Sequence, residues 1–274
     1  MKLIKRSLFW LSVIAACLPP IAAFATGPTD TYYLTAGEPG GTNWAVQGNA
    51  VVNSWPQHHP ESGGEYAIAV SSTVRTLGSN QITNHPGSEY ALNGTYTGTD
   101  YAYPSVTNRF YDGTTDGSFN YSVDYSGGGV YRMNSDWSQS TLLFNSVTNA
   151  LGITYDPSNN SLWISSFNTN TVVDYSLTGT PLSSFSVPFS KITCLALDPA
   201  DQTLWMGSQS TEGTFYQYSK AGAQLNTQFY SALANQNTLG GEFAVPEPGT
   251  IGLLGLGSAV LVLGAWRRRK WAAK

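Results

Sequence analysis

The chain has 274 residues, of which 41% are apolar and 13% aromatic, so it can bury a core and wholesale disorder is excluded. Charged residues make up only 11%, whereas an ordinary globular protein has about 25%. Residues 26–245 hold five Lys or Arg and 16 Asp or Glu, a formal charge of −11. This charge excludes a nucleic-acid partner, because neutralising phosphates requires clustered cations.

The first 25 residues are typical of a secretory signal peptide. Basic residues at the start precede an apolar run over residues 8–16, which is too short to span a bilayer comfortably. Ala23 and Ala25 then form an A-x-A cleavage pattern, and we expect cleavage after Ala25. In an alternative interpretation, Cys17 follows a lipobox-like Ile-Ala-Ala and becomes the lipidated first residue of a lipoprotein.

The body of the chain repeats with a period of about 42 residues. In each of two copies an apolar run is followed by Asp-Pro and then by Leu-Trp. These elements are Asp156-Pro157 with Leu162-Trp163 and, 42 residues later, Asp198-Pro199 with Leu204-Trp205. A third copy is visible in its second half, because residues 130–134 match residues 172–176. A period of this length indicates a repeat architecture.

Each unit predicts four short strands, because apolar residues alternate or form short runs between turn residues. Four strands in about 42 residues are typical of one β-propeller blade. The pattern resembles the propellers of secreted bacterial proteins but lacks the His and Trp-Asp marks of WD40 repeats. We therefore predict an all-β fold, a β-propeller of about five blades over residues 26–243, with a β-sandwich as the alternative.

The prediction is weaker in the first half of the body. Residues 66–70, 89–92 and 119–125 have the composition of strand cores. The stretch from Gly37 to Gly64 fits less well and is interpreted as a divergent blade or a loop-rich cap.

The tryptophans are expected to have two kinds of role. Trp163 and Trp205 recur at equivalent positions, which favours packing between neighbouring sheets. Trp44, Trp55 and Trp137 lie outside the clear repeat among Gly, Asn, Pro and Ser. For these three, exposed platforms that stack on sugars are an alternative to ordinary packing.

The aspartates suggest turns and one candidate ion site. Asp156 and Asp198 each precede a proline, and a turn explains both. The stretch from Asp112 to Gly117 contains Asp112 and Asp116 in a Gly-permitted segment, which makes it a candidate calcium loop. It lacks the spacing of an EF-hand, so a plain hairpin loop is the alternative, and no cofactor is otherwise predicted.

Other reactive residues form no known pattern. His58, His59 and His85 are the only imidazoles, and no neighbouring ligand completes a set of the usual spacing. Cys194 is the one cysteine left after removal of the signal peptide, and we expect a small buried hydrophobe in a strand. No H-E-x-x-H, G-x-S-x-G or phosphate-loop motif occurs, and we predict no catalytic residue.

The last 30 residues predict a membrane-inserted tail. An uncharged stretch over residues 250–266 spans about 25 Å as a helix, just enough for a hydrocarbon core of about 30 Å with some thinning. A cationic cluster then follows directly: Arg267, Arg268, Arg269 and Lys270. Such a cluster stays on the cytoplasmic side, so the body is expected to lie outside the membrane.

These features together resemble the PEP-CTERM sorting tail of Gram-negative bacteria. The residues that carry the motif are Val245, Pro246, Glu247 and Pro248, followed by the Gly- and Leu-rich apolar stretch and the Arg cluster. The resemblance covers residues 245–274. It implies recognition by an exosortase, cleavage near Pro-Glu-Pro, and delivery to the cell surface or the exopolysaccharide matrix of a biofilm.

Two functions are consistent with these observations. The first is a non-catalytic binding or structural protein of the cell surface or matrix, with extracellular polysaccharide as a partner. The alternative is a secreted carbohydrate-active enzyme, a lyase or hydrolase that uses a pair of carboxylates at the propeller axis. Two acidic residues in one concave site would favour the enzyme.

Overall fold

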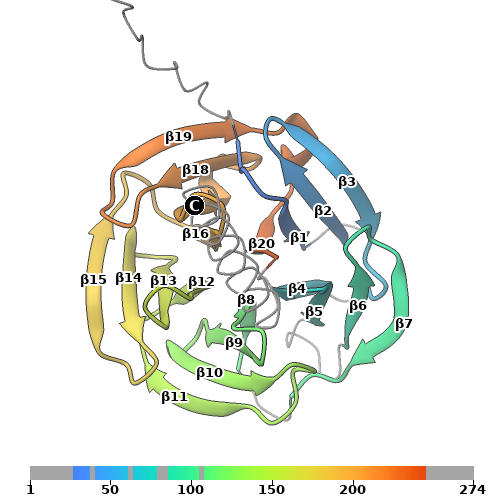
Figure 1. Ribbon diagram of the computed structural model, residues 1–274, viewed down its shortest axis with the longest axis horizontal. Helices are drawn as coiled ribbons and strands as arrows, with labels where there is room; N and C mark the ends of the chain where they lie inside the picture. Colours follow the sequence, from blue (N-terminus) through green and yellow to red (C-terminus); the bar gives the residue numbers. More distant parts are fainter. Residues whose placement is uncertain (1–26, 38–40, 61–63, 79–85, 105–107, 245–274) are drawn as a thin grey trace, which may run out of the picture.

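Five four-stranded antiparallel sheets surround a central axis as the blades of a propeller (Figure 1). The computed structural model describes residues 27–37, 41–60, 64–78, 86–104 and 108–244. The predicted five-bladed propeller is therefore confirmed, and the sandwich alternative is wrong. The expected signal peptide, the sorting residues 245–248, the helix over 250–266 and the cationic cluster 267–270 lie outside the described residues.

We number the blades along the chain, with strands given from the axis outward. Blade 1 contains β20 (Thr238–Phe243), β1 (Tyr32–Ala36), β2 (Thr42–Gln47) and β3 (Ala50–Pro56). Blade 2 contains β4 (Glu65–Val70), β5 (Thr73–Gly78), β6 (Gly87–Ala91) and β7 (Tyr96–Tyr101). Blade 3 contains β8 (Phe110–Thr115), β9 (Phe119–Asp124), β10 (Gly129–Asn134) and β11 (Thr141–Asn145).

The two remaining blades are those with the clear sequence repeat. Blade 4 contains β12 (Ala150–Asp156), β13 (Ser161–Ser166), β14 (Thr171–Ser176) and β15 (Pro181–Ser186). Blade 5 contains β16 (Ile192–Asp198), β17 (Thr203–Ser208), β18 (Thr214–Tyr218) and β19 (Gln224–Phe229). Two 3-10 helices, η2 (Gln209–Thr211) and η3 (Ser231–Leu233), follow β17 and β19. Within the described residues, no helical segment is long or apolar enough to cross a bilayer.

Blade 1 closes the ring by combining both ends of the body. The C-terminal strand β20 pairs antiparallel with β1, in a register that places Phe243 opposite Tyr32. The side chains of these two residues also stack, with ring centroids 4.7 Å apart. Because β2 and β3 complete this sheet, the described part of the stretch from Gly37 to Gly64 contributes to a divergent blade and is not a loop-rich cap.

The repeated residues pack as the period predicts. Trp163 of β13 and Trp205 of β17 are buried. Asp156 and Asp198 end β12 and β16, and their Oδ1 atoms accept backbone hydrogen bonds in the following turns, each at 3.0 Å. The turn and packing interpretations are both confirmed for these four residues.

The other tryptophans correct one expectation. Trp55 and Trp137 are 7% and 0% exposed, so the exposed-platform interpretation is wrong for both. Trp55 packs between blades 1 and 2 with Tyr33 and Tyr90. Trp44 is partly buried and packs against the core between blades 1 and 5.

Cys194 of β16 is fully buried, as expected from its place in a strand. Its sulfur accepts a hydrogen bond from the Tyr32 hydroxyl at 3.5 Å. Burial raises the pKa of the Cys194 thiol to about 12, so the group stays protonated and unreactive near neutral pH.

Candidate functional site

Every innermost strand has a β-bulge near its first residues. The register shifts between Glu65 and Ala67 in β4, Phe110 and Gly113 in β8, Ala150 and Ile153 in β12, and Ile192 and Cys194 in β16. In β20 the shift lies at Leu239, opposite Thr35 and Ala36 of β1. A bulge bends a strand and redirects a side chain. Five bulges around one axis therefore redirect side chains at the same end of the propeller.

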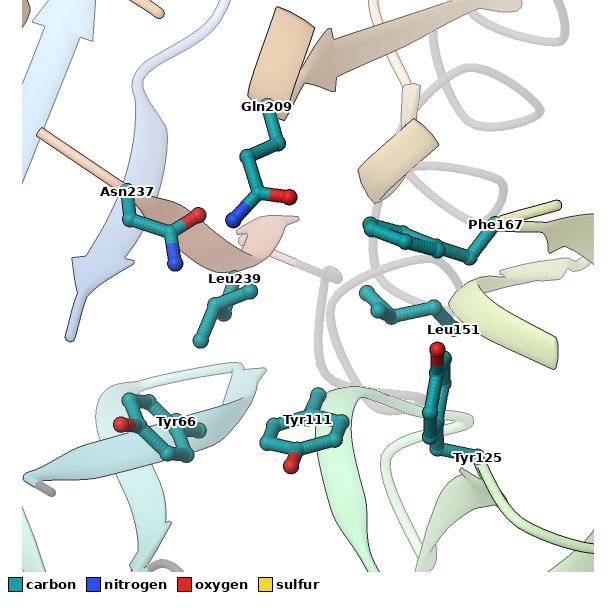
Figure 2. Close-up of a pocket in the computed structure, with 8 residues that line it drawn as sticks. All are labelled: Tyr66, Tyr111, Tyr125, Leu151, Phe167, Gln209, Asn237 and Leu239. Atoms are coloured by element: carbon teal, nitrogen blue, oxygen red, sulfur yellow. The ribbon is translucent and has the colours of Figure 1, made fainter. Parts of the chain in front are cut away.

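A cavity of about 320 Å³ lies at this end (Figure 2). Its lining residues are Tyr66, Tyr111, Tyr125, Leu151, Phe167, Gln209, Asn237 and Leu239. They come from all five blades or from the segments directly beside them. Four of them are the second residues of innermost strands, where the bulges lie. The cavity is thus formed by the axial convergence of the blades.

Aromatic side chains form one wall of this cavity. Tyr66 and Tyr111 have ring centroids 5.5 Å apart, Tyr111 and Tyr125 5.7 Å, and Tyr125 and Phe167 5.8 Å. These separations are within the range of favourable aromatic pairs. The four rings therefore form a continuous apolar surface.

Amide side chains complete the opposite side. Figure 2 shows Gln209 and Asn237 across the cavity from Tyr66 and Tyr111. The Asn237 Oδ1 atom is buried and has no hydrogen-bond partner among the described residues. Such an acceptor is costly to leave unpaired, so a bound molecule with a hydroxyl or N–H donor would satisfy it. Among the described residues, none that lines the cavity carries a carboxylate, an imidazole or a cationic group.

Asp112 lies in β8 next to the pocket residue Tyr111 and is fully buried. Its Oδ1 accepts hydrogen bonds from the backbone N–H groups of Gly113 and Gly241, each at 2.9 Å. Its Oδ2 accepts from the N–H groups of Ile153 and Leu195, each at 3.0 Å. Burial raises the pKa of Asp112 well above its usual value, although the four N–H donors oppose this shift. The carboxylate joins the innermost strands of blades 1, 3, 4 and 5.

Asp116 belongs to a different network. Its Oδ1 accepts from the N–H groups of Ser118 and Phe119, and its Oδ2 accepts from the Tyr121 hydroxyl, all at 2.7 Å. These contacts form the turn of the β8–β9 hairpin. The structure does not bring the Asp112 and Asp116 carboxylates together as one ligand set, because Asp112 faces the axis. The hairpin alternative accounts for this segment.

Glu242 of β20 is the second buried acid near the axis. It accepts hydrogen bonds from Phe243 N–H at 2.9 Å and from the Thr154 hydroxyl at 3.4 Å. Burial raises its pKa well above the usual value, and the charge of Asp112 adds to the shift. Glu242 borders a narrow cavity of about 20 Å³ at the ends of β12, β16 and β20, the opposite end of the axis from the aromatic cavity. Of the acids in the described part of the chain, Asp112 and Glu242 thus lie at the axis, and neither lines the aromatic cavity.

Sequence reasoning missed the aromatic cavity, although the repeat contains a signal for it. Tyr125, Phe167 and Gln209 follow one another at intervals of 42 residues, directly or closely after the second strands of blades 3, 4 and 5. They occupy one structural position in three blades. At this position the residue type changes from aromatic to amide, whereas the core positions of the repeat stay apolar. Such a change is the signal that could have marked this position as part of a binding surface.

Residues 244–270 match the PEP-CTERM protein-sorting motif. No curated protein matches the chain. Among solved structures, a chain of the nidogen/laminin complex is similar with a TM-score of 0.53 and 13% identity, over 78% of this chain and 98% of that one. Virginiamycin B lyase from Staphylococcus aureus is similar with a TM-score of 0.45 and 14% identity, over 72% and 69%.

At such identities the likeness to solved structures concerns the fold alone. The fold therefore defines the class: this is a five-bladed β-propeller protein. The chain also carries a PEP-CTERM protein-sorting motif, which implies export and an exosortase-sorted surface protein.

Proposed function

We propose that this protein is a non-catalytic binding module of the cell surface or exopolysaccharide matrix, and that its aromatic cavity binds a neutral segment of an extracellular polysaccharide. An exosortase removes or exchanges its tail after the body has crossed the membrane. The tail holds the chain in the inner membrane until that step.

The observation that carries this proposal is the composition of the cavity. A sugar ring presents an apolar C–H face, which fits the wall of four aromatic rings, and hydroxyl groups, which fit Gln209 and the unpaired Asn237 Oδ1. Uncharged lining residues favour a neutral sugar over an anionic one. The formal charge of −11 on residues 26–245 also disfavours an acidic polymer.

The enzyme alternative has less support. A hydrolase or lyase needs acid and base groups that reach the substrate. Asp112 and Glu242 are fully buried and hydrogen-bonded within the axis, and neither borders the aromatic cavity.

Binding is tested on a glycan array with neutral and uronic-acid-containing polysaccharides. We expect binding to neutral glycans, weakened by about 2- to 12-fold in Tyr125→Ala and in Phe167→Ala, as the loss of about 0.5–1.5 kcal/mol of ring stacking implies. Phe229→Ala is the matched control, because that ring is 54% exposed and lies outside the cavity. Binding that Phe229→Ala weakens as much as the cavity variants do would refute the assignment.

Localisation is tested separately. The full chain and a variant that lacks residues 245–274 are expressed in an exosortase-containing host, and the cells are fractionated. We expect only the full chain to pass through a membrane-bound intermediate. Equal membrane retention of both forms would contradict the role of the tail.

A further inference from the structure

A second cluster of chemistry-bearing side chains lies away from the axis, between blades 1 and 2. His58 and His59 follow β3, and Asp100 lies near the end of β7. One ligand atom from each residue lies within 4.8 Å of the others. Three potential metal ligands therefore lie together where the outer strand of blade 2 adjoins the segment that leaves blade 1.

The closest pair already has the spacing of two ligands on one ion. His59 Nε2 lies 3.2 Å from Asp100 Oδ1. In a tetrahedral zinc site with bonds of about 2.0–2.1 Å, neighbouring ligand atoms are about 3.3 Å apart. His58 is exposed, and its ring centroid is 4.7 Å from that of His59. The His58 ring also stacks on the Tyr96 ring, with centroids 3.9 Å apart, and this contact holds it beside the other two ligands.

Outer groups hold all three residues in place. The Asp100 Oδ1 accepts a hydrogen bond from the Tyr96 hydroxyl at 2.9 Å. The Tyr90 hydroxyl accepts from the backbone N–H of His58 at 2.7 Å, and Glu65 Oε1 accepts from that of His59 at 3.1 Å. The two N–H bonds fix the backbone of the histidines, whereas the Tyr96 hydroxyl orients the Asp100 carboxylate itself, as outer groups regularly do in metal sites.

The charge around the cluster favours a cation. Glu65 is fully buried, and the groups that hydrogen-bond to its carboxylate are neutral: the hydroxyls of Thr76, Ser88 and Tyr90 and the His59 N–H. The Ser88 hydroxyl lies 2.9 Å from Glu65 Oε1 and 3.2 Å from Asp100 Oδ1. It has one proton and cannot donate to both carboxylates. A positive ion beside Asp100 would offset this shortage of donors and of positive charge.

We propose that His58, His59 and Asp100 bind one divalent transition-metal ion of the zinc type. Two imidazoles and one carboxylate are ligands that Zn²⁺ accepts, whereas Ca²⁺ and Mg²⁺ prefer oxygen ligands alone. Three protein ligands leave the fourth position to water or to an external donor. This inference does not depend on the proposed glycan binding.

The test is isothermal titration of the full chain, purified in detergent and freed of metal with a chelator, with ZnCl₂. We expect one strong site in the wild type and a loss of that site in the double variant with His58→Ala and His59→Ala. Tyr96→Phe removes only an orienting hydroxyl, so we expect it to weaken zinc binding by about 10- to 100-fold. Titration with CoCl₂ gives a second readout, because tetrahedral Co²⁺ has intense visible bands that six-coordinate Co²⁺ lacks.

Two variants serve as controls. His85→Ala removes one imidazole outside the described residues, and Asp136→Asn removes an exposed carboxylate of blade 3; both should bind zinc as the wild type does. Thermal melting without zinc checks that each variant is folded. Zinc should raise the melting temperature of the wild type and of both controls, but not that of the double variant. If the double variant does not fold, the single variant His58→Ala must by itself show the loss of zinc binding. Zinc binding that survives in folded His58→Ala and double variants, or that falls equally in His85→Ala, overturns the proposal.

Discussion

The Asp112 carboxylate of β8 accepts a hydrogen bond from the Gly241 N–H of β20 at 2.9 Å, although 129 residues separate the two. Gly241 belongs to the strand that closes the ring through its pairing with β1. One side chain of blade 3 thus holds the closing strand from across the axis. The same carboxylate also accepts N–H groups from blades 4 and 5.

The first prediction concerns this carboxylate. We expect Asp112→Asn to lower the free energy of unfolding of residues 26–244 by about 2–4 kcal/mol, because an amide keeps one acceptor oxygen where four buried N–H groups require two. Urea denaturation followed by tryptophan fluorescence measures the change. Glu212→Gln, at a partly exposed turn, is the control and should change stability by less than about 0.5 kcal/mol. A loss at Asp112 no larger than that of the control would show that the axial hydrogen bonds contribute little.

The role of Asp112 was not predictable from its neighbours in the sequence. Asp112 and Asp116 occur together in a segment with two glycines, and such a composition is common to hairpins and to calcium loops. The difference lies in which residue faces the axis. That depends on the bulge between Phe110 and Gly113 and on amides more than 40 residues away along the chain. The local sequence shows neither where the bulge lies nor which distant amides meet the carboxylate.

The second prediction concerns pH and Glu242. Burial raises the pKa of Glu242 in the folded state, so this residue binds its proton more tightly when folded than when unfolded. Its contribution to stability is therefore fully present below the ordinary carboxyl pKa of about 4.3 and is lost as the pH rises through the raised folded pKa. Glu242→Gln stays neutral throughout. We expect the wild type to lose stability relative to Glu242→Gln over the pH range that begins near the ordinary carboxyl pKa of about 4.3 and ends at the raised folded pKa.

The measurement is the difference in unfolding free energy between the two proteins at each pH. Using the difference removes the contribution of the other carboxylates, such as Asp156, whose pKa is lowered by hydrogen bonds from Lys220 and Ser158 against the effect of burial. A difference that stays constant across this range would mean that Glu242 has the same pKa in both states.

The fold was predictable where the repeat is regular. Blades 4 and 5 share Asp-Pro turns and Leu-Trp strands at one spacing, and these positions are structural in both. Blade 1 was harder to interpret because β20 is separated from β1 by most of the chain, so no local period includes the whole sheet. The aromatic cavity was missed for a related reason. Its residues come from five blades, and only their convergence at the axis makes them one site.

The third prediction compares the two repeated tryptophans, which differ in one hydrogen bond. Trp163 Nε1 donates to Asp156 Oδ2 at 3.2 Å, whereas the buried Trp205 Nε1 has no partner among the described residues. In blade 5 the corresponding carboxylate, Asp198, instead accepts from the backbone N–H groups of Thr29 at 2.8 Å and Asp30 at 3.3 Å. The N-terminal segment of the body therefore occupies the acceptor that Trp205 would use.

Replacement of each tryptophan by phenylalanine removes a similar apolar area, so the difference between the two losses isolates the hydrogen bond. We expect Trp163→Phe to lower the free energy of unfolding by about 1–2 kcal/mol more than Trp205→Phe, because it also removes a donor from a buried carboxylate. Asp156→Asn measured alone and together with Trp163→Phe completes a double-mutant cycle, and the coupling energy should account for that excess. Equal losses in the two phenylalanine variants, or additive effects in the cycle, would show that packing alone sets the contribution of these repeated tryptophans.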